Sequence, residues 1–284
     1  MPFATNVELM RKARQGGYAV GAFNINNMES AQAVVGAAVA ERSPVIIACT
    51  PGAMKYAGVS YLSAIARTAS EEAAVPVSLH LDHGLTIEHV QACLDAGFSS
   101  VMIDASSRPF EENVRLTRMV VKIARPAGVS VEAELGRIAG AEDALTTGDR
   151  EASMTDPEEA AEFCRLTGVD ALAVSIGNAH GWYKGEPKLD FDRLGAIRER
   201  VDALLVLHGA SGIPDDMIRR ACAVGVDKIN IDTEIRDAFR QAVAVFLEAN
   251  PDVIDPRKIL GPAREAMKGV VARKMRLFGS SGKA

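Results

Sequence analysis

The chain has 284 residues, of which 48% are hydrophobic and 24% are charged, and its formal net charge is −5. This composition is typical of a globular protein, and the absence of a basic block argues against nucleic-acid binding. No apolar run approaches the ~20 residues of a membrane span, no export signal opens the chain, and four separated cysteines indicate reduced thiols, so we expect a cytoplasmic protein without membrane contact.

Short apolar segments alternate with longer segments of helical periodicity along the whole chain. The apolar segments, predicted to be strands, are 18–23, 45–49, 77–81, 100–103, 129–133, 171–176, 204–207 and 228–231. The segments predicted to be helices are 28–41, 61–74, 86–96, 109–124, 157–166, 191–200, 214–223 and 234–248. Because strands buried on both faces read as continuous apolar runs, this alternation predicts a parallel sheet.

Eight strand–helix units close naturally into a barrel, so we predict an α/β fold with a single (β/α)8 TIM barrel over residues 1–284. The alternative is an open doubly wound sheet, but no glycine fingerprint opens the first unit. Residues 255–278 are expected to form one extra C-terminal helix outside the barrel. Two long loops, 135–155 and 177–190, follow the fifth and sixth strands, where barrel enzymes usually place functional residues.

Polar residues follow nearly every predicted strand. Because the carboxyl ends of parallel barrel strands meet at one rim, these side chains are expected to converge on an active site. The residues in this set are Asn24, Thr50, Asp82, His83, Asp104, Glu134, His180, His208, Asn230 and Asp232.

Three of the five histidines belong to this rim: His83, His180 and His208. Three neutral imidazoles with an open fourth position are the ligand set of a catalytic zinc site, although a single rim histidine is as often only hydrogen-bonded. His80 alternates with Asp82 on the third strand and is expected to point inward as a supporting residue, whereas His89 is expected at the surface.

Several carboxylates accompany the histidines. Asp82, beside His83, is suited to exchange a proton with a substrate hydroxyl, or else only orients a histidine. Asp104 and Glu134 end neighbouring strands and are expected to orient ligands or to hold a second cation. Glu142 lies in a glycine-containing part of the long fifth loop, from which a carboxylate can approach a bound substrate.

Two turns are suited to phosphate binding. Residues 208–212 follow the seventh strand with two glycines and a serine, and residues 230–233 follow the eighth with polar side chains. Phosphate sites in barrels often use these two positions, where backbone N–H groups and hydroxyls donate hydrogen bonds.

These motifs, taken in order, resemble those of the class II fructose- and tagatose-bisphosphate aldolases. The matching segments are YAVGAFN (18–24), HLDHG (80–84), SVMIDAS (100–106), VEAELG (131–136), HGASG (208–212) and KINIDT (228–233), and the tail from 255 to 280 fits as well. The resemblance covers essentially the whole chain.

The resemblance implies zinc on three histidines, His83, His180 and His208. It implies that Asp82 accepts the C4 hydroxyl proton while the C3–C4 bond breaks, and that Glu142 moves the proton at the nucleophilic carbon of dihydroxyacetone phosphate. It also implies that Asp104 and Glu134 support the zinc or hold a second divalent ion.

The resemblance further implies how a sugar phosphate is bound. A monovalent cation, Na⁺ or K⁺, lies beside the phosphate in many members, and members are homodimers or homotetramers. Thr50 stands where relatives often have a serine near the aldehyde phosphate, and Arg236 is expected to reach that phosphate in a neighbouring subunit. The residues implied to hold the triose phosphate are Gly181, Gly209, Ala210, Ser211, Asn230, Ile231, Asp232 and Thr233.

Fructose 1,6-bisphosphate is the expected substrate, because tagatose-type relatives usually carry Ala at the position of Asp232 and Lys at that of Arg236. Tagatose 1,6-bisphosphate, the C4 epimer, or a related phosphorylated ketose is the alternative. A non-catalytic aldolase-like subunit and a zinc hydrolase are alternatives of other classes. A non-catalytic subunit need not retain Asp82, the three histidines and Glu142 together, as this chain does.

Overall fold

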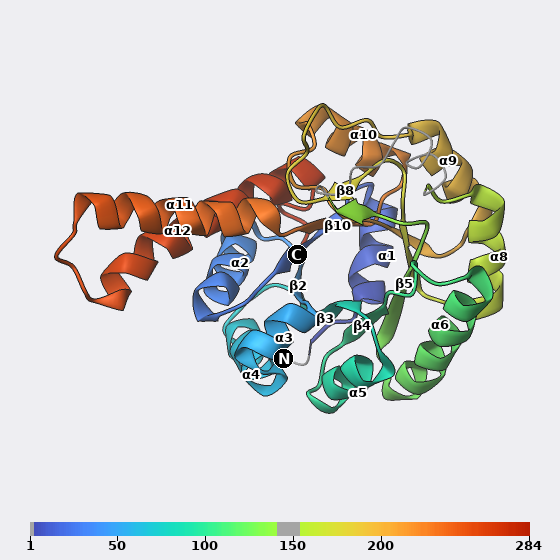
Figure 1. Cartoon of the computed structure of the whole chain (residues 1–284), viewed down its shortest axis with the longest axis horizontal. Helices are drawn as coiled ribbons and strands as arrows, with labels where there is room; N and C mark the ends of the chain where they lie inside the picture. Colours follow the sequence, from blue (N-terminus) through green and yellow to red (C-terminus); the bar gives the residue numbers. More distant parts are fainter. Residues whose placement is uncertain (1–2, 141–153) are drawn as a thin grey trace.

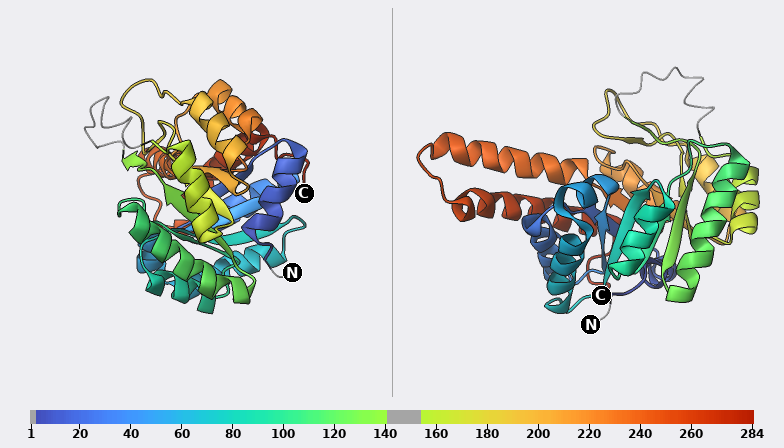
Figure 2. Two further views of the ribbon diagram at one scale, coloured as in Figure 1. Left: turned by 90° about the vertical axis from the view of Figure 1, so that its right-hand side faces the viewer. Right: turned by 60° about the horizontal axis from the view of Figure 1, so that its bottom comes forward.

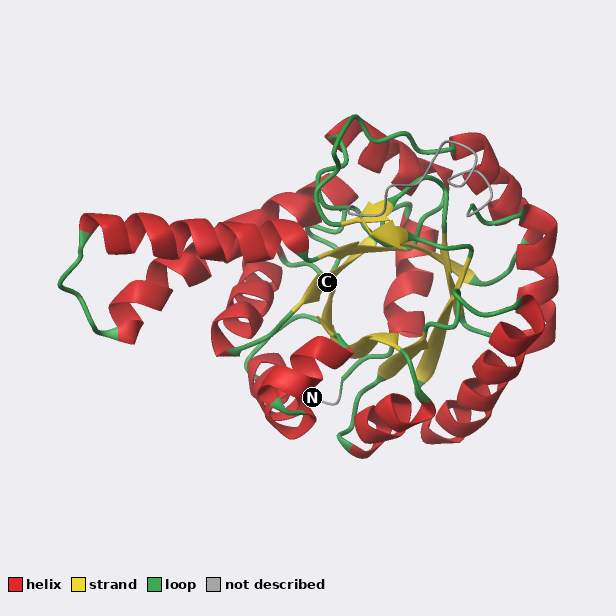
Figure 3. Cartoon of the chain, in the orientation of Figure 1, coloured by secondary structure: helices red, strands yellow, loops and turns green. Residues whose placement is uncertain are grey.

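The computed structural model describes residues 3–140 and 154–284 and contains a closed barrel of eight parallel strands in the order β1-β10-β9-β7-β5-β4-β3-β2 (Figure 3). The predicted barrel is therefore confirmed, and the open doubly wound sheet is excluded. The barrel strands are β1 (Val20–Asn24), β2 (Val45–Cys49), β3 (Val77–Gly84), β4 (Ser100–Ile103), β5 (Ser130–Leu135), β7 (Ala171–Val174), β9 (Leu204–Leu207) and β10 (Lys228–Ile231).

Helices surround the barrel and connect its strands (Figure 1). They bury one apolar stripe each against the outward-facing strand residues, as Phe163 does in the core that it shares with Ile229 of β10. The surrounding helices are α2 (Met28–Glu41), α3 (Pro51–Ala57), α4 (Val59–Glu71), α5 (Ile87–Asp95), α6 (Phe110–Ala124), the 3-10 helix η1 (Arg125–Ala127), α8 (Pro157–Thr167), α9 (Phe191–Arg200) and α10 (Asp215–Val224).

Helix α1 (Asn6–Gly16) was not predicted, and it covers the N-terminal end of the barrel, where Figure 3 shows a helix through the ring of strands. A capping box between Thr5 and Glu8 begins it. Met10 is fully buried among Met102, Ala173 and other apolar residues of the barrel interior. Helix α1 is therefore an apolar plug, and the opposite end of the barrel is left for chemistry.

The other differences from prediction are local. Helix α3 was not predicted, because the turn at Thr50 and Pro51 was not recognised as a helix start, although the Thr50 hydroxyl caps it through the Ala53 N–H. Strand β3 continues to Gly84, beyond the predicted end at residue 81. This extension brings Asp82 and His83 into the strand itself.

Two long loops meet above the barrel. Strand β6 (Ala139–Gly140), after β5, pairs in parallel with β8 (Ala179–His180), after β7. The pairing fixes the backbone of His180 over the C-terminal rim. The loop following β6 contains Glu142, which lies outside the described residues.

The last two helices, α11 (Thr233–Ala249) and α12 (Pro256–Phe278), run side by side and extend away from the barrel as an arm (Figure 2). Helix α12 is the predicted extra C-terminal helix, and it packs on α2 and β1. Among the described residues, no helix has the length and apolarity needed to cross a membrane.

Candidate active site

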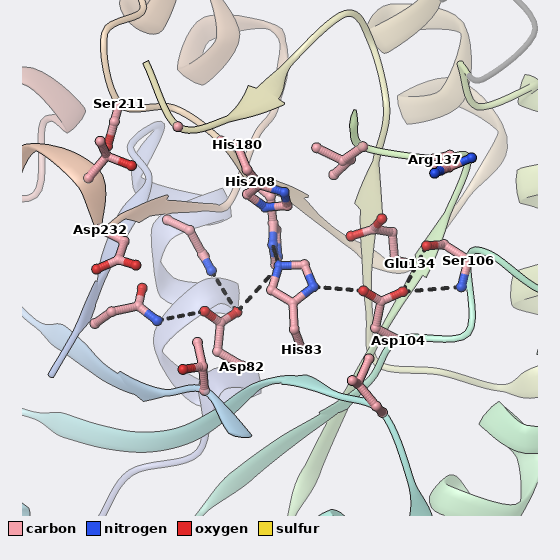
Figure 4. Close-up of a pocket in the computed structure, with 18 of the residues that line it drawn as sticks. Asp82, His83, Asp104, Ser106, Glu134, Arg137, His180, His208, Ser211 and Asp232 are labelled. Carbon is pink, nitrogen blue, oxygen red and sulfur yellow. Dashed lines mark hydrogen bonds and ion pairs between the residues drawn. The ribbon is translucent and has the colours of Figure 1, made fainter. Parts of the chain in front are cut away.

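A cavity of about 430 Å³ opens at the C-terminal rim of the barrel (Figure 4). Most of the residues selected from the sequence line it, so the predicted convergence on one rim is observed. The selected residues in its lining are Asn24, Thr50, Asp82, His83, Asp104, Glu134, His180, Gly181, His208, Gly209, Ser211, Asn230, Asp232 and Thr233.

Of the selected residues within 3–140 and 154–284, three do not line this cavity. Ala210 and Ile231 are fully buried, with their side chains in the hydrophobic core, so only their backbone groups can face a ligand. Arg236 on α11 is 54% exposed and pairs with Asp232, its Nε lying 2.7 Å from the carboxylate. Its guanidinium is therefore exposed next to an aspartate of the cavity lining.

An irregularity at the end of β3 places two consecutive residues in the same site. Side chains alternate along a strand, so Asp82 and His83 would normally face opposite sides. The β3–β4 register shifts between Leu81 and Gly84, and His83 adopts a left-handed φ of 51°. Gly84 permits this close approach, since a Cβ there would lie 2.4 Å from the Met102 carbonyl oxygen. Such bulges re-aim side chains at active sites, at a cost in backbone strain.

The three histidines form a compact cluster. The ring centroid of His83 lies 4.9 Å from that of His180 and 4.6 Å from that of His208. One ligand nitrogen from each ring lies within 4.8 Å of the others, as a shared metal ion requires. Burial and the nearby His83 lower the pKa of His180 to about 3, and burial also lowers the pKa of His208. Both rings are therefore neutral, which metal ligation demands.

The hydrogen bonds of His83 and His208 fit a metal ion. Nδ1 of His83 lies 2.7 Å from Asp104, and Nε2 of His208 lies 2.8 Å from Glu132. Since carboxylates accept hydrogen bonds, these nitrogens carry the hydrogen, and the other nitrogen of each ring has a lone pair whenever the ring is neutral. Those two nitrogens, His83 Nε2 and His208 Nδ1, face each other at 2.8 Å. A proton shared by these two nitrogens, or a cation beside them, satisfies both lone pairs.

The surroundings of His83 also favour positive charge. Burial alone lowers its pKa, but the Asp82 charge and the hydrogen bond to Asp104 raise it to about 10. A proton or a metal ion can supply that charge. Two carboxylates flank the ring on opposite sides (Figure 4), and their negative charges favour a positive charge on the ring or next to it.

Asp82 is buried and held by two amides. Nδ2 of Asn24 donates to one oxygen at 2.7 Å, and Nδ2 of Asn230 donates to the other at 3.0 Å. Burial alone raises the pKa of Asp82, but the charges of His83 and Lys228 lower it below its ordinary value. Asp82 is thus an ionised base, with one oxygen 4.0 Å from His83 Nε2.

A second group of possible metal ligands lies on the other side of His83. Ligand atoms of His83, Asp104 and Glu134 lie within 4.8 Å of one another. Burial and the Asp104 charge raise the pKa of Glu134 to about 8. Within residues 3–140 and 154–284, its Oε2 is a buried atom without a hydrogen-bond partner. An added cation there satisfies this atom and lowers the cost of ionising the carboxyl.

The loop that carries His180 crosses closely over the end of β9. Gly209 has a φ of 61°, and a Cβ there would lie 2.3 Å from the Ala179 carbonyl oxygen, so only glycine fits. The Tyr183 hydroxyl accepts from the Ala179 N–H and donates to the Gly209 carbonyl, each at 2.9 Å. These contacts hold His180 against the phosphate-binding candidate 209–212.

A buried polar network beneath the histidines was not recognised in the sequence. Glu132 accepts from Lys228 Nζ at 2.7 and 2.9 Å, besides its contact with His208, and both residues are at most 1% exposed. His80 lies 3.4 Å from the same Nζ and is neutral, because burial and Lys228 lower its pKa to about 3. The inward, supporting position predicted for His80 is observed.

Five further residues line the cavity but were not selected from the sequence. Arg137 follows β5, and Figure 4 places it with Ser106 on the side of Asp104 and Glu134. Because these residues lie in loops, strand periodicity gave no signal for them. The five are Leu85, Ser106, Ser107, Arg137 and Ile138.

Comparison with known families shows a match along nearly the whole chain. The family described as "Fructose-bisphosphate aldolase class-II" matches residues 4–283. A fructose-bisphosphate aldolase of Geobacillus stearothermophilus is 48% identical over 287 residues, which cover 100% of this chain and 99% of that protein. A D-tagatose-1,6-bisphosphate aldolase subunit, GatY, of Klebsiella oxytoca is also 48% identical, with 96% of both chains covered.

A solved structure extends the similarity to three dimensions. The YdjI aldolase from Escherichia coli superimposes with a TM-score of 0.88 and is 39% identical in sequence, with 99% of both chains covered. The barrel, the appended helices and the position of the rim are therefore shared with an aldolase of known structure.

Proposed function

Because the chain belongs to the class II fructose-bisphosphate aldolase family, a family of metal-dependent lyases, we propose that it reversibly cleaves fructose 1,6-bisphosphate to dihydroxyacetone phosphate and glyceraldehyde 3-phosphate. The observation that carries this proposal is the convergence of three histidines beside an ionised, buried aspartate. We infer that residues 1–284 act as one catalytic domain and, since all four cysteines are free thiols, that the enzyme works in the cytoplasm.

Asp82 has the protonation state that cleavage requires. As an ionised carboxylate, it accepts the proton of the C4 hydroxyl while the C3–C4 bond breaks and the aldehyde carbonyl forms at C4. Asn24 and Asn230 hold both of its oxygens, so it meets the substrate in one orientation. The buried Oδ1 of Asn230, which has no partner among the described residues, is available to accept a hydrogen bond from a substrate hydroxyl.

We assign the catalytic zinc to His83, His180 and His208, whose neutral or carboxylate-bound rings suit that ion. When bound, zinc supplies a Lewis acid that stabilises negative charge on the ketone oxygen of the triose. Asp104 and Glu134 orient His83 or hold a second divalent ion, and the buried Oε2 of Glu134, which has no hydrogen-bond partner in the described part of the chain, supports this assignment.

Glu142, outside the described residues, stays our prediction for the group that returns a proton to C3. The triose phosphate is assigned to the backbone of Gly181, of Gly209 to Ser211 and of Asn230 to Thr233, with hydroxyls from Ser211 and Thr233. All of these except the apolar Ala210 and Ile231 line the cavity. We place a monovalent cation, Na⁺ or K⁺, beside this phosphate, and the dependence of activity on these ions tests that assignment.

We place the part of the substrate that becomes glyceraldehyde 3-phosphate between Asp82, Thr50 and Asp232. Figure 4 shows Asp232 on the same side of the cavity as Asp82, and Thr50 is also in the lining. A carboxylate at this point is suited to read the configuration at C4, the centre at which fructose and tagatose bisphosphates differ. The tagatose enzyme subunit of Klebsiella oxytoca is as similar as the fructose enzyme, so the tagatose epimer is the second candidate.

We further propose a homodimer or homotetramer. The arm of α11 and α12 exposes large apolar side chains, with Val245 66% and Ile254 92% exposed. Exposed apolar residues on a protruding element are typical of contacts between protein copies. Such an assembly lets Arg236 reach the distal phosphate in a neighbouring subunit, where its planar fork suits phosphate oxygens. Light scattering of the purified protein tests the assembly.

One kinetic experiment tests the proposed function. Cleavage of fructose and tagatose 1,6-bisphosphates is measured by coupled detection of triose phosphate, with and without a chelator. We expect chelator-sensitive cleavage with fructose bisphosphate preferred. A preference for the tagatose epimer contradicts the substrate assignment alone, whereas no triose phosphate from either sugar points to a non-catalytic subunit or a hydrolase.

A further inference from the structure

A nearly buried ion pair connects the appended helix α12 to the rim of the cavity. Lys274 on α12 is 6% exposed, and its Nζ lies 2.6 Å from Oε1 of Glu234 in the first turn of α11. The same carboxylate oxygen accepts a hydrogen bond from the Gly212 N–H at 3.0 Å. Neither charged residue lines the cavity, so the proposed reaction steps use neither of them.

The ion pair contacts the turn of residues 209–212, which is assigned to the triose phosphate. The Ser211 hydroxyl, which faces the cavity, accepts from the Glu234 N–H at 3.4 Å. Gly212 has a φ of 80° and lies against the indole of Trp182, since a Cβ there would be 3.1 Å from the ring. Glu234 of α11, through its N–H and its carboxylate, and the Trp182 ring therefore both contact this turn.

The charges of the pair matter as much as its hydrogen bonds. A lone carboxylate next to an anion-binding turn would repel phosphate, and low exposure would leave that repulsion poorly screened. Lys274 neutralises Glu234 at hydrogen-bond distance. Since desolvation offsets most of the attraction in a buried ion pair, such a pair adds little net stability. Its effect on the neighbouring turn is therefore the larger consequence.

We propose that Glu234 and Lys274 are positioning residues for triose-phosphate binding. Glu234 fixes the phosphate-binding turn through Gly212, and Lys274 removes the repulsion that this carboxylate would otherwise exert on the ligand. Helix α12, which lies outside the barrel, thereby contributes to ligand affinity. The inference rests on the proposed function, because it takes residues 209–212 as part of the phosphate site.

Calorimetric titration of the zinc-loaded enzyme with dihydroxyacetone phosphate tests this role. Lys274→Met leaves the Glu234 charge unpaired and is expected to weaken binding by about tenfold or more. In cleavage assays the same variant should raise KM while kcat stays near the wild-type value. The double variant Glu234→Gln with Lys274→Met removes both charges but keeps an oxygen that can accept from Gly212, so most of the affinity should return.

Arg276→Met is a matched control on the same helix. It removes an ion pair with Glu41, whose Oε2 lies 3.0 Å from Arg276 Nε and which has no contact with the turn. This variant should bind the ligand like the wild type, and zinc content and melting temperature are recorded for every protein.

Three results would overturn the positioning role. Each leaves the proposed function intact, provided that the wild-type enzyme binds dihydroxyacetone phosphate. They are wild-type affinity in Lys274→Met, equal weakening in the single and double variants, and equal weakening in the Arg276→Met control. If Lys274→Met does not fold, Lys274→Gln replaces it, and its affinity for dihydroxyacetone phosphate is compared with that of the double variant. Failure of the wild-type enzyme itself to bind dihydroxyacetone phosphate would instead contradict the proposed function.

Discussion

The two ends of the barrel are made by the same eight strands but carry opposite kinds of side chain. At the N-terminal end, Met10 of α1 packs among apolar interior residues, and Arg14 pairs with Asp227 at 2.7 Å. At the C-terminal end, Glu134 and Asn230 have buried oxygens without partners in the described chain, and His83 adopts a strained left-handed backbone.

The difference shows how the fold divides its tasks. Apolar contacts and paired charges at the N-terminal end stabilise the folded state. Unsatisfied groups and backbone strain at the C-terminal end cost stability and are available for ligands. Substitutions at the two ends of the barrel should therefore have different effects. Those at the N-terminal end should change the free energy of unfolding, and those at the C-terminal end should change catalysis.

Removal of the metal should have the largest effect and should act on the C-terminal end alone. Chelation is expected to abolish cleavage, and Zn²⁺ or Co²⁺ should restore it, because three imidazoles suit these ions. Borohydride added with substrate should not inactivate the enzyme, since no Schiff base forms. Metal analysis by mass spectrometry accompanies each assay, and full activity in protein free of metal would refute the zinc assignment.

Asp82→Ala should reduce cleavage by roughly 10²–10⁴-fold, the usual effect of losing a general acid–base group. Proton exchange on dihydroxyacetone phosphate should remain measurable in this variant, because exchange needs the metal and Glu142 but not Asp82. Glu142→Ala should suppress both reactions. Exchange followed by NMR in deuterated water checks this, and equal loss of exchange in Asp82→Ala with zinc still bound would contradict the division of roles.

Met10→Ala tests the opposite end of the barrel. The side chain is fully buried in the apolar plug, so its truncation should lower the free energy of unfolding by about 2–5 kcal/mol. Values of kcat and KM, measured where the variant is still folded, should match the wild type. Val39→Ala on the exposed side of α2 is the control and should change stability by less than about 0.5 kcal/mol. Altered kcat or KM in Met10→Ala would contradict the claim that the N-terminal end of the barrel affects stability and not catalysis.

Glu132→Gln should weaken zinc binding by about 10- to 100-fold, the usual effect of removing a carboxylate that orients a metal ligand. Glu132 does not line the cavity and acts through His208, from which it lies 2.8 Å. Competition with a chelator of known affinity gives the dissociation constant. The exposed Glu162→Gln on α8 is the control. Unchanged zinc affinity in Glu132→Gln would show that the ring of His208 keeps its orientation without this contact.

The rim residues were predictable because their position follows from topology: every parallel strand ends at the same face. Hence Asp82, His83 and His208 were selected correctly as neighbours although far apart in sequence. The orientation of His83 was not predictable, because it depends on a register shift between β3 and β4. The contact between Glu132 and Lys228 joins strands that are not adjacent, so no local pattern reveals it. Helix α1 did carry a signal, the Thr5 and Glu8 capping box.

The smallest effect concerns Asp232, where the two bisphosphates should be distinguished. Burial raises the pKa of this carboxyl to about 6, with Arg236 opposing and Asp82 adding to the shift. Because the folded-state pKa lies above the unfolded value, ionising Asp232 costs folding stability, and this cost develops as pH rises from 3.8 to about 6 and is complete above that pH. Asp232→Asn should therefore melt at a higher temperature than the wild type at pH 8, and the gain should shrink toward pH 4.

The same titration should appear in substrate choice. Above pH 6 the ionised Asp232 is a stronger hydrogen-bond acceptor for the C4 hydroxyl region, so the preference for fructose over tagatose bisphosphate should be largest there. The ratio of the two kcat/KM values should fall severalfold between pH 8 and pH 5, on the order of 1 kcal/mol. In Asp232→Asn the ratio should be small and independent of pH, because the amide does not titrate. Measuring both substrates in the same buffers cancels effects on the shared machinery of Asp82 and the histidines. If the ratio of the two kcat/KM values varies equally with pH in the wild type and in Asp232→Asn, another group titrates. Asp232 would then not distinguish the two sugars.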